Sequence, residues 1–240
     1  MNTIRKDQII QNRALLDTYK AQLSDLTDIQ YQVAIGVLLG DASLQSQDGG
    51  KTYRLKFEQG DVHKDYIEHL YSVFDEWSLN SPIVKERTNA NNKVVISWAF
   101  QTISHSAFLS LAKIFLCRLD PKTGSYKKSI KEDFGEKYLS PRSLAYWFMD
   151  DGGKMDYTKN EGKGIVLNTH GFSHDEVEIL SSALAKQFNL NCWVKKNKGK
   201  PVIAISGKCY EQMLDLIGDF VIPSMKNKFP SPRRPKKLMT

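Results

Sequence analysis

The stretch 143-SLAYWFMDDGGK-154 is an apolar run that ends abruptly in two aspartates and two glycines. Ser140 followed by Pro141, just upstream, is typical of a helix N-cap with proline at the first helical position, so the run is predicted to be a helix. Asp151 then lies at its C-terminal end, where a carboxylate faces the negative pole of the helix dipole at a cost of about 0.3–1 kcal/mol. Because this position is unfavourable for an acid, Asp151 is expected to have a functional role.

A second run, 33-VAIGVLLGDAS-43, repeats the pattern and ends in Asp41. Gly36 and Gly40, four residues apart, leave one helix face bare, so another helix can approach it closely. If the two apolar helices pack side by side, Asp41 and Asp151 become neighbours that repel each other. Divalent cations would relieve this repulsion together with both dipole penalties, and hard oxygen ligands suit Mg²⁺. For either run alone, a turn after an ordinary core helix is the simpler interpretation, but two copies favour a site.

Composition limits the class of protein. The 240 residues are 41% hydrophobic, which excludes a disordered chain, and 34 Lys and Arg against 27 Asp and Glu give a net charge of +7. This balance favours an anionic partner such as nucleic acid without requiring one. The three separated cysteines match neither a disulfide framework nor a cysteine zinc site, which indicates a reducing compartment. No run approaches the ~18 apolar residues of a membrane span, and the N-terminus lacks a hydrophobic signal core.

Elements are predicted in an order that occurs twice: helix, two strands, helix, two strands, helix. Thr27 with Gln30, and Ser173 with Glu176, form predicted capping boxes that start the first helix and a later one. Alternating residues predict strands at 53–59, 93–101 and 164–170 and a two-stranded ribbon at 192–206 with a turn at Asn197 to Lys200. The remaining predicted helices cover 62–77, 105–119, 174–188 and 209–221.

The motifs resemble a known family. "AIGVLLGDA" (34–42) and "LAYWFMDDG" (144–152) are similar to the two namesake motifs of the LAGLIDADG homing endonucleases in their single-chain, two-repeat form. The resemblance extends over nearly the whole chain, through "GKTY" (50–53), "IVLNT" (165–169) and "LNCWVK" (190–195). There are departures, because Ala42 replaces the last glycine of the first motif. Tyr146 and Asp150 also stand where the first copy has small residues, which puts the symmetry of helix packing in question.

The resemblance implies an α+β fold of two pseudo-symmetric αββαββα repeats in one chain. The LAGLIDADG helices would pack at the repeat interface, and the antiparallel sheets would form a saddle over DNA. The expected divisions are an N-terminal helical extension at 1–26, a first repeat at 27–119, a basic linker at 120–139, a second repeat at 140–230 and a basic C-terminal tail at 231–240.

The resemblance also implies a catalytic apparatus. Asp41 and Asp151 would each bind divalent metal near one scissile phosphate, with the carbonyls of Gly40 and Asp150 as further ligands. Mg²⁺ is the expected ion, with Mn²⁺ also accepted. One lysine per half would face the phosphate: Lys128 and Lys228, with Lys127 and Lys226 as alternatives. Strand-end residues that would order solvent near the metals are Glu58, Gln59, Thr169 and His170.

DNA contacts are expected from the polar faces of the sheets. Strands and turns that a two-stranded ribbon could place in the major groove carry the candidates. These residues are Arg54, Lys56, Lys85, Arg87, Ser97, Gln101, Lys195, Lys196, Lys198 and Lys200. For any single one of them, a solvated surface side chain is the competing interpretation.

The expected function is therefore a site-specific double-strand DNA endonuclease of the intron-homing type. It would act as a monomer on a long asymmetric site and need neither a membrane nor a protein partner. An intron RNA maturase is the alternative, and a non-catalytic DNA-binding protein on the same scaffold is a third reading, against which the two aspartates weigh. A mitochondrial location is implied by the resemblance alone.

Overall fold

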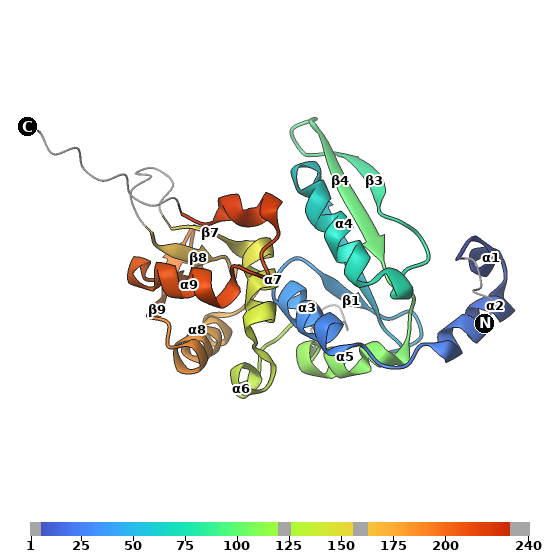
Figure 1. The fold of residues 1–240 in the computed structure, drawn as a ribbon, viewed down its shortest axis with the longest axis horizontal. Helices are drawn as coiled ribbons and strands as arrows, with labels where there is room; N and C mark the ends of the chain where they lie inside the picture. The colour runs from blue at the N-terminus through green and yellow to red at the C-terminus, as the bar shows by residue number, and fades with distance from the viewer. Residues whose placement is uncertain (1–5, 120–125, 156–162, 231–240) are drawn as a thin grey trace, which may run out of the picture. The chain divides into compact units, whose positions relative to one another are not determined.

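The computed structural model describes residues 6–119, 126–155 and 163–230. Two compact units emerge, one of Met1–Ala34 with Asp41–Lys113 and the other of Ile35–Gly40 with Ile114–Thr240. Each unit holds a four-stranded antiparallel sheet, and the element order αββαββα occurs twice (Figure 1). The predicted α+β class and its duplicated order are confirmed.

The first repeat follows two N-terminal helices, α1 and α2. Its sheet has the strand order β1-β2-β4-β3. The elements are α1 Lys6–Gln11, α2 Arg13–Gln22, α3 Asp28–Leu39, β1 Ser43–Gln45, β2 Arg54–Gly60, α4 Lys64–Val73, β3 Ile83–Thr88, β4 Val94–Gln101 and α5 Leu109–Phe115.

The second repeat has the equivalent strand order β7-β8-β10-β9. Its elements are α7 Pro141–Asp151, β7 Gly152–Lys154, β8 Ile165–Leu167, α8 His174–Phe188, β9 Cys192–Asn197, β10 Lys200–Ile205 and α9 Tyr210–Ile217. Short 3-10 turns accompany these elements at η1 Asp61–His63, η2 Asp75–Trp77, η3 Ser106–Phe108, η4 Gly207–Cys209 and η5 Pro223–Lys228. Three strands of the two four-stranded sheets lay outside the predicted strand ranges: β1 and β7, whose three residues are too few to show alternation, and the six-residue β3.

Helix starts follow the predicted caps. The Thr27 amide donates to Gln30 Oε1 at 3.0 Å, and the Gln30 amide donates to Thr27 Oγ1 at 3.2 Å, which completes the capping box of α3. Ser173 and Glu176 make the same exchange at the start of α8. Ser140 caps α7 with Pro141 in its first turn, as predicted, and the capping-box partner is Ser143. Local sequence therefore sets where these helices begin.

The segment between the repeats contains more structure than its composition indicates. It holds β5 Arg118–Leu119, β6 Tyr126–Lys127 and α6 Phe134–Tyr138. Phe134 is buried, and its ring meets that of Phe115 edge-on at 5.5 Å between centroids. Gly135 allows α6 to approach Ala183 of α8, because a Cβ at Gly135 would overlap that side chain. The predicted basic tail, 231–240, lies outside the described residues.

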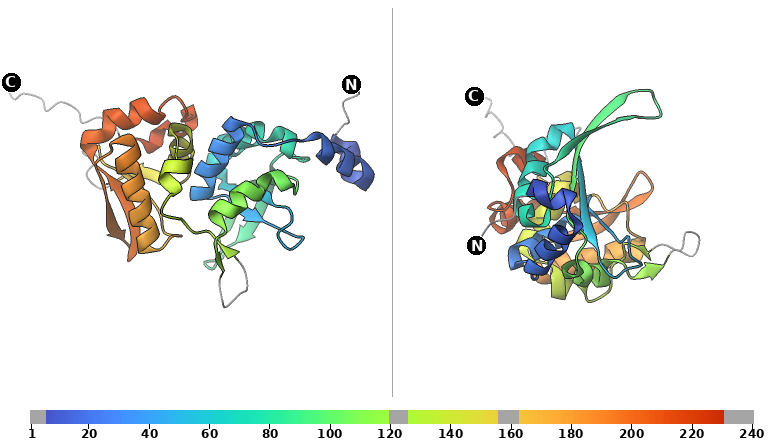
Figure 2. Two further views of the ribbon diagram at one scale, coloured as in Figure 1. Left: turned by 90° about the horizontal axis from the view of Figure 1, so that it is seen from below. Right: turned by 90° about the vertical axis from the view of Figure 1, so that its right-hand side faces the viewer.

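Each sheet has one face covered by a helix. In the first unit, Phe57 of β2 stacks on Phe100 of β4 at 4.5 Å, and Tyr71 of α4 packs edge-on against the same Phe100. In the second unit, α8 lies against β9 and β10 (Figure 2). Cys192 Sγ of β9 donates there to the Ser181 carbonyl of α8 at 3.1 Å. Alternation along the strands then directs every second side chain to the opposite, open face.

Candidate active site

The C-terminal half of α3 packs closely on α7 inside the second unit. A Cβ at Gly36 would overlap the Ser143 carbonyl oxygen and lie 2.7 Å from the Cβ of Tyr146. A Cβ at Gly40 would overlap the side chain of Asp150. The predicted close approach at the two glycines is confirmed. Gly36 and Gly40 of α3 face the larger Tyr146 and Asp150 of α7. These two residues fill the space left by the missing side chains of the glycines.

Lys128 reaches the end of α3. It follows β6, its side chain is partly buried, and its Nζ donates to the carbonyls of Leu38 at 2.9 Å and Gly40 at 2.8 Å. These are among the last carbonyls of the helix, which have no partner within it. The neighbouring Lys127 is exposed on the two-residue strand β6.

Lys228 makes the equivalent contacts at the end of α7. It lies in η5, and its Nζ donates to the carbonyl of Met149 and, at 2.7 Å, to that of Asp150. Lys226, two residues earlier, is exposed. Both motif helices thus have a lysine hydrogen-bonded to the carbonyl that precedes the terminal aspartate.

These lysines change the electrostatic argument for a metal. An ammonium group at a helix C-terminus interacts favourably with the dipole, by about 0.3–1 kcal/mol at the surface and more where it is partly buried. Lys128 and Lys228 therefore offset the dipole penalty that, from the sequence alone, only divalent cations were expected to relieve. They also occupy the carbonyl oxygens of Gly40 and Asp150, which were predicted as metal ligands.

Asp41 lies two residues after the last residue of α3, in the first unit, and it is exposed. Gln59 at the end of β2 donates its amide Nε2 to Asp41 Oδ2 at 3.0 Å. Gln59 is itself buried, with 8% of its surface exposed, so its amide is held in place by packing. One carboxylate oxygen of Asp41 is thus oriented by a fixed donor.

Asp151 is the last residue of α7, and its surroundings differ. Its main-chain carbonyl accepts hydrogen bonds from the amide and the side-chain Nδ2 of Asn168, both at 3.0 Å. Asp151 also lines a small pocket of about 120 Å³ together with Lys128, Gly40 and His170. Asp151 and Lys128, which were predicted as catalytic residues of different halves, therefore line one cavity of the second unit.

Thr169 and His170 are placed differently from each other. Thr169 is buried, and its hydroxyl donates to the Pro201 carbonyl at 2.9 Å, which ties β8 to β10. His170 is exposed at the rim of the small pocket. Both residues of this predicted solvent-ordering pair line the pocket, but the Thr169 hydroxyl donates its hydrogen to the Pro201 carbonyl.

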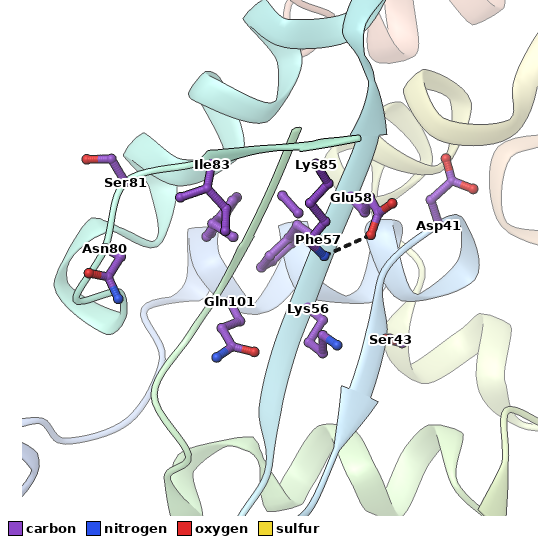
Figure 3. A pocket seen from close by; sticks show the side chains of 12 residues that line it. Asp41, Ser43, Lys56, Phe57, Glu58, Asn80, Ser81, Ile83, Lys85 and Gln101 are labelled. Atoms are coloured by element: carbon purple, nitrogen blue, oxygen red, sulfur yellow. Dashed lines mark hydrogen bonds and ion pairs between the residues drawn. The ribbon is translucent and has the colours of Figure 1, made fainter. Parts of the chain in front are cut away.

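The first sheet presents a polar open face. Pairing of Lys56 with Gln101 and of Lys85 with Ser97 places these side chains on one side of the sheet, opposite Phe57 and Phe100. A hollow of about 500 Å³ lies on this side and includes Asp41, Ser43, Lys56, Glu58, Lys85 and Gln101 in its lining (Figure 3). By alternation the open face of the first sheet comprises Arg54, Lys56, Glu58, Ile83, Lys85, Arg87, Val95, Ser97, Ala99 and Gln101. All six DNA-contact candidates of the first repeat belong to it.

Glu58 and Gln59 lie on opposite faces of β2, because consecutive strand residues alternate. Glu58 accepts hydrogen bonds from Lys85 Nζ at 3.1 Å, from Arg87 Nη2 at 2.8 Å and from Ser97 Oγ at 3.0 Å. Partial burial raises the pKa of Glu58, but the hydrogen bonds and the two positive charges outweigh it, so this pKa lies below its usual value. Of the two residues, Gln59 contacts Asp41, while Glu58 binds residues expected to contact DNA.

The candidates of the second sheet divide between its two faces. Lys195 and Lys200 lie on the open face by alternation from Cys192, which faces α8. Lys196 lies on the other face, and Lys198 occupies the turn with a positive φ of 50°. Trp193 shares the open face with Lys195 and is 43% exposed. Sequence reasoning passed over this tryptophan, although its two-residue spacing from Lys195 indicated it.

Among the described residues, no three His, Cys, Asp or Glu side chains gather as a metal cluster. A divalent ion would therefore rely on one or two carboxylates, main-chain carbonyls and oxygens from a ligand, a donor set that suits Mg²⁺. Exposed Asp41 and pocket-lining Asp151 supply such carboxylates. The described part of the chain also has no helix long and apolar enough to cross a membrane.

Comparison with known proteins decides the family. The model described as the LAGLIDADG DNA endonuclease family matches residues 31–213. The chain belongs to this LAGLIDADG family. The resemblance of the two motifs is thereby confirmed.

Relatives of this LAGLIDADG protein include endonucleases and maturases. It is 44% identical over 218 residues to the probable intron-encoded endonuclease 1 of Wickerhamomyces canadensis, with 90% of each chain covered. It is 29% identical over 202 residues to the cytochrome b mRNA maturase bI2 of Debaryomyces hansenii, covering 82% of this chain and 72% of that protein. A solved structure of the homing endonuclease I-WcaI bound to its DNA recognition sequence is 42% identical, with a TM-score of 0.85, and covers 94% of this chain and 98% of that one.

Proposed function

We propose that this LAGLIDADG protein is a site-specific double-strand DNA endonuclease of the intron-homing type. It hydrolyses one phosphodiester bond on each strand of a long asymmetric site and leaves 5′-phosphate and 3′-hydroxyl ends with 3′ overhangs. The observation that carries the proposal is the matching end of both motif helices. α7 ends in Asp151 and α3 ends two residues before Asp41, and the carbonyl before each aspartate accepts a hydrogen bond from a lysine.

Asp41 and Asp151 are proposed to bind one divalent cation each, Mg²⁺ with Mn²⁺ as a substitute. When bound, such ions activate the attacking water and stabilise the leaving 3′ oxygen. Gln59 keeps one oxygen of Asp41 in a fixed direction, and Asn168 holds the main chain at Asp151. The carbonyls of Gly40 and Asp150 serve as further ligands in this proposal if each lysine shares its carbonyl or gives it up.

Lys128 and Lys228 are proposed to donate to the scissile phosphates once DNA is bound. Each ammonium group contacts the carbonyl of the residue that precedes a proposed metal ligand: Gly40 before Asp41, and Asp150 before Asp151. A positive group in this place stabilises charge that develops on phosphate oxygens. The open sheet faces would hold the duplex, and the two repeats, which differ in sequence, would read different half-sites.

The main test is cleavage of DNA by purified protein. With Mg²⁺ the protein is expected to linearise a plasmid that carries a target selected from a randomised library. Asp41→Asn and Asp151→Asn are each expected to lower the rate at least about a hundredfold, because charge stabilisation by a metal is worth several kcal/mol. Both variants and an EDTA-treated sample should still bind the target.

Asp215→Asn is the matched control, because it removes the same charge from an exposed position on α9. It should cut at the wild-type rate. Undiminished cleavage by Asp41→Asn or Asp151→Asn would disprove the assigned roles.

The maturase relatives make assistance of RNA splicing a second function to test. Identity to them is 28–29%, against 44% to the endonuclease, so DNA cleavage is the leading proposal. An in vitro splicing reaction with the Asp41→Asn, Asp151→Asn double variant separates the activities, since stimulated splicing without cleavage would establish the second one. A mitochondrial location is proposed with either function, from the intron-encoded and cytochrome b mRNA maturase relatives.

A further inference from the structure

A carboxylate holds together the basic residues of one binding face. Glu58 of β2 accepts hydrogen bonds from Lys85 and Arg87 of β3 and from Ser97 of β4, at 3.1, 2.8 and 3.0 Å. We call these four residues the Glu58 cluster. They come from three adjacent strands, and Figure 3 shows Lys85 extending over the sheet to Glu58.

An acid at this position works against simple attraction of DNA. The open face of the first sheet otherwise carries Arg54, Lys56, Lys85 and Arg87, and phosphates favour such a surface. A negative charge in its middle repels phosphates and neutralises part of the attraction. Stability of the fold does not explain the acid well, because partly exposed ion pairs contribute little. Its presence is better explained by what it does to Lys85 and Arg87.

Glu58 holds two long side chains by hydrogen bonds, that of Lys85 and that of Arg87, the latter 62% exposed. The side chains of Lys85 and Glu58 are only 32% and 34% exposed, and Ser97, which fixes the other carboxylate oxygen, is buried. A donor that is already oriented loses less freedom when it binds a base edge. A donor already paired with an acid gains less from an arbitrary phosphate.

We propose that Glu58 is a positioning residue for sequence discrimination, and that Lys85 and Arg87 of the Glu58 cluster read a G·C pair in the major groove. Held by Glu58, Arg87 and Lys85 would donate to the guanine acceptors O6 and N7. The inference rests on the proposed function as a DNA endonuclease. It adds which residues select the target and that they distinguish a G·C pair from other base pairs.

The test measures binding rather than cleavage. Wild type and Glu58→Gln are each equilibrated, without divalent metal, with a library of randomised duplexes, and the bound duplexes are sequenced. Wild type is expected to enrich G·C at one or two adjacent positions that Glu58→Gln does not. At those positions the preference should fall by about tenfold, the size of a good base contact, and every other position should be unchanged. Affinity for unselected DNA should rise several-fold.

Glu86→Gln is the matched control. Glu86 lies on the same strand as Lys85 and Arg87 but on the opposite face, paired with Ile96, and its loss changes the net charge equally. This variant should keep the wild-type profile. Lys85→Met is a second variant, which leaves Glu58 in place and should weaken the same positions.

The outcomes separate this inference from the proposed function. A Glu58→Gln profile equal to that of wild type, or a uniform loss of preference at all positions, overturns the role of Glu58. The same holds if Glu86→Gln reproduces the effect, because net charge then explains it. Absence of cleavage by wild type with Mg²⁺ would overturn the endonuclease proposal instead, and a Glu58-dependent binding profile would survive that result.

Discussion

Single residues at the helix ends are held by partners from distant parts of the chain. Lys128 and Lys228 donate to main-chain carbonyls, and Gln59 donates to the carboxylate of Asp41. Asn168 donates to the main-chain carbonyl of Asp151, and Gln59 donates to the side chain of Asp41. Each aspartate is therefore held by a polar residue from the second strand of its own sheet or the residue that follows it.

His69, which lies outside the candidate site, is expected to make the stability of the fold depend on pH. His69 of α4 is half-buried, and burial lowers the pKa of its imidazole. In the unfolded chain the pKa is about 6.5, so the unfolded state takes up the proton first as the pH falls. We expect the free energy of unfolding to decrease from pH 7 to pH 5.5, and to decrease less in His69→Gln. Urea titrations at both values measure it, and parallel losses in the two proteins would contradict the assignment.

At the scale of elements, the packing of α3 on α7 depends on missing side chains. Gly36 and Gly40 face Tyr146 and Asp150, so the two motifs are complementary rather than alike. The second motif lacks the small residues of the first because only one of the two helices needs to be bare for a close approach. Tyr146 and Asp150, which depart from the small residues of the first motif, thus fill the interface between α3 and α7.

Gly36→Ala should destabilise the protein although alanine favours helix. The added Cβ would overlap the Ser143 carbonyl, and because this neighbour is backbone, we expect a cost near the upper end of the about 1–3 kcal/mol of overpacking, more than the propensity gain of about 1 kcal/mol. Chemical denaturation measures the change. Gly60→Ala is the control, because nothing lies near its Cβ position and its φ is −60°. Equal stability of Gly36→Ala and wild type would show that the helices can separate at no cost.

The whole molecule has a net charge of +7 and contains one four-stranded sheet in each repeat. Each of these sheets has one face covered by a helix and one open face. Basic residues on an open face attract the DNA backbone whatever its sequence, whereas the Glu58 cluster is expected to act at particular base pairs. Affinity and discrimination therefore depend differently on salt.

Raising the salt from 50 to 200 mM should weaken binding to a random duplex by about 10³–10⁵-fold if 6–10 phosphates are contacted. Fluorescence anisotropy at several salt concentrations gives the slope. The preference for a selected target over a random duplex should change much less, since base contacts release few counterions. If the affinity for a random duplex does not change with salt concentration, the basic faces do not account for DNA binding.

The helix starts, the duplicated order of elements and the family could all be predicted from the amino-acid sequence. Thr27, Ser140 and Ser173 cap helices through neighbours three residues away, and strand alternation is also local, so both can be read along the chain. The two motifs carry enough identity to indicate the LAGLIDADG family without any coordinates.

Tertiary structure alone decided which side chains meet. Lys128 contacts the carbonyl of Gly40 across 88 positions of sequence, whereas its neighbour Lys127 is exposed on β6. Glu58 turned out to bind Lys85 and Arg87, while its neighbour Gln59 binds Asp41. Such pairings follow from how sheets and helices pack, because residues distant in sequence become neighbours only when the core forms, and no local pattern records that proximity.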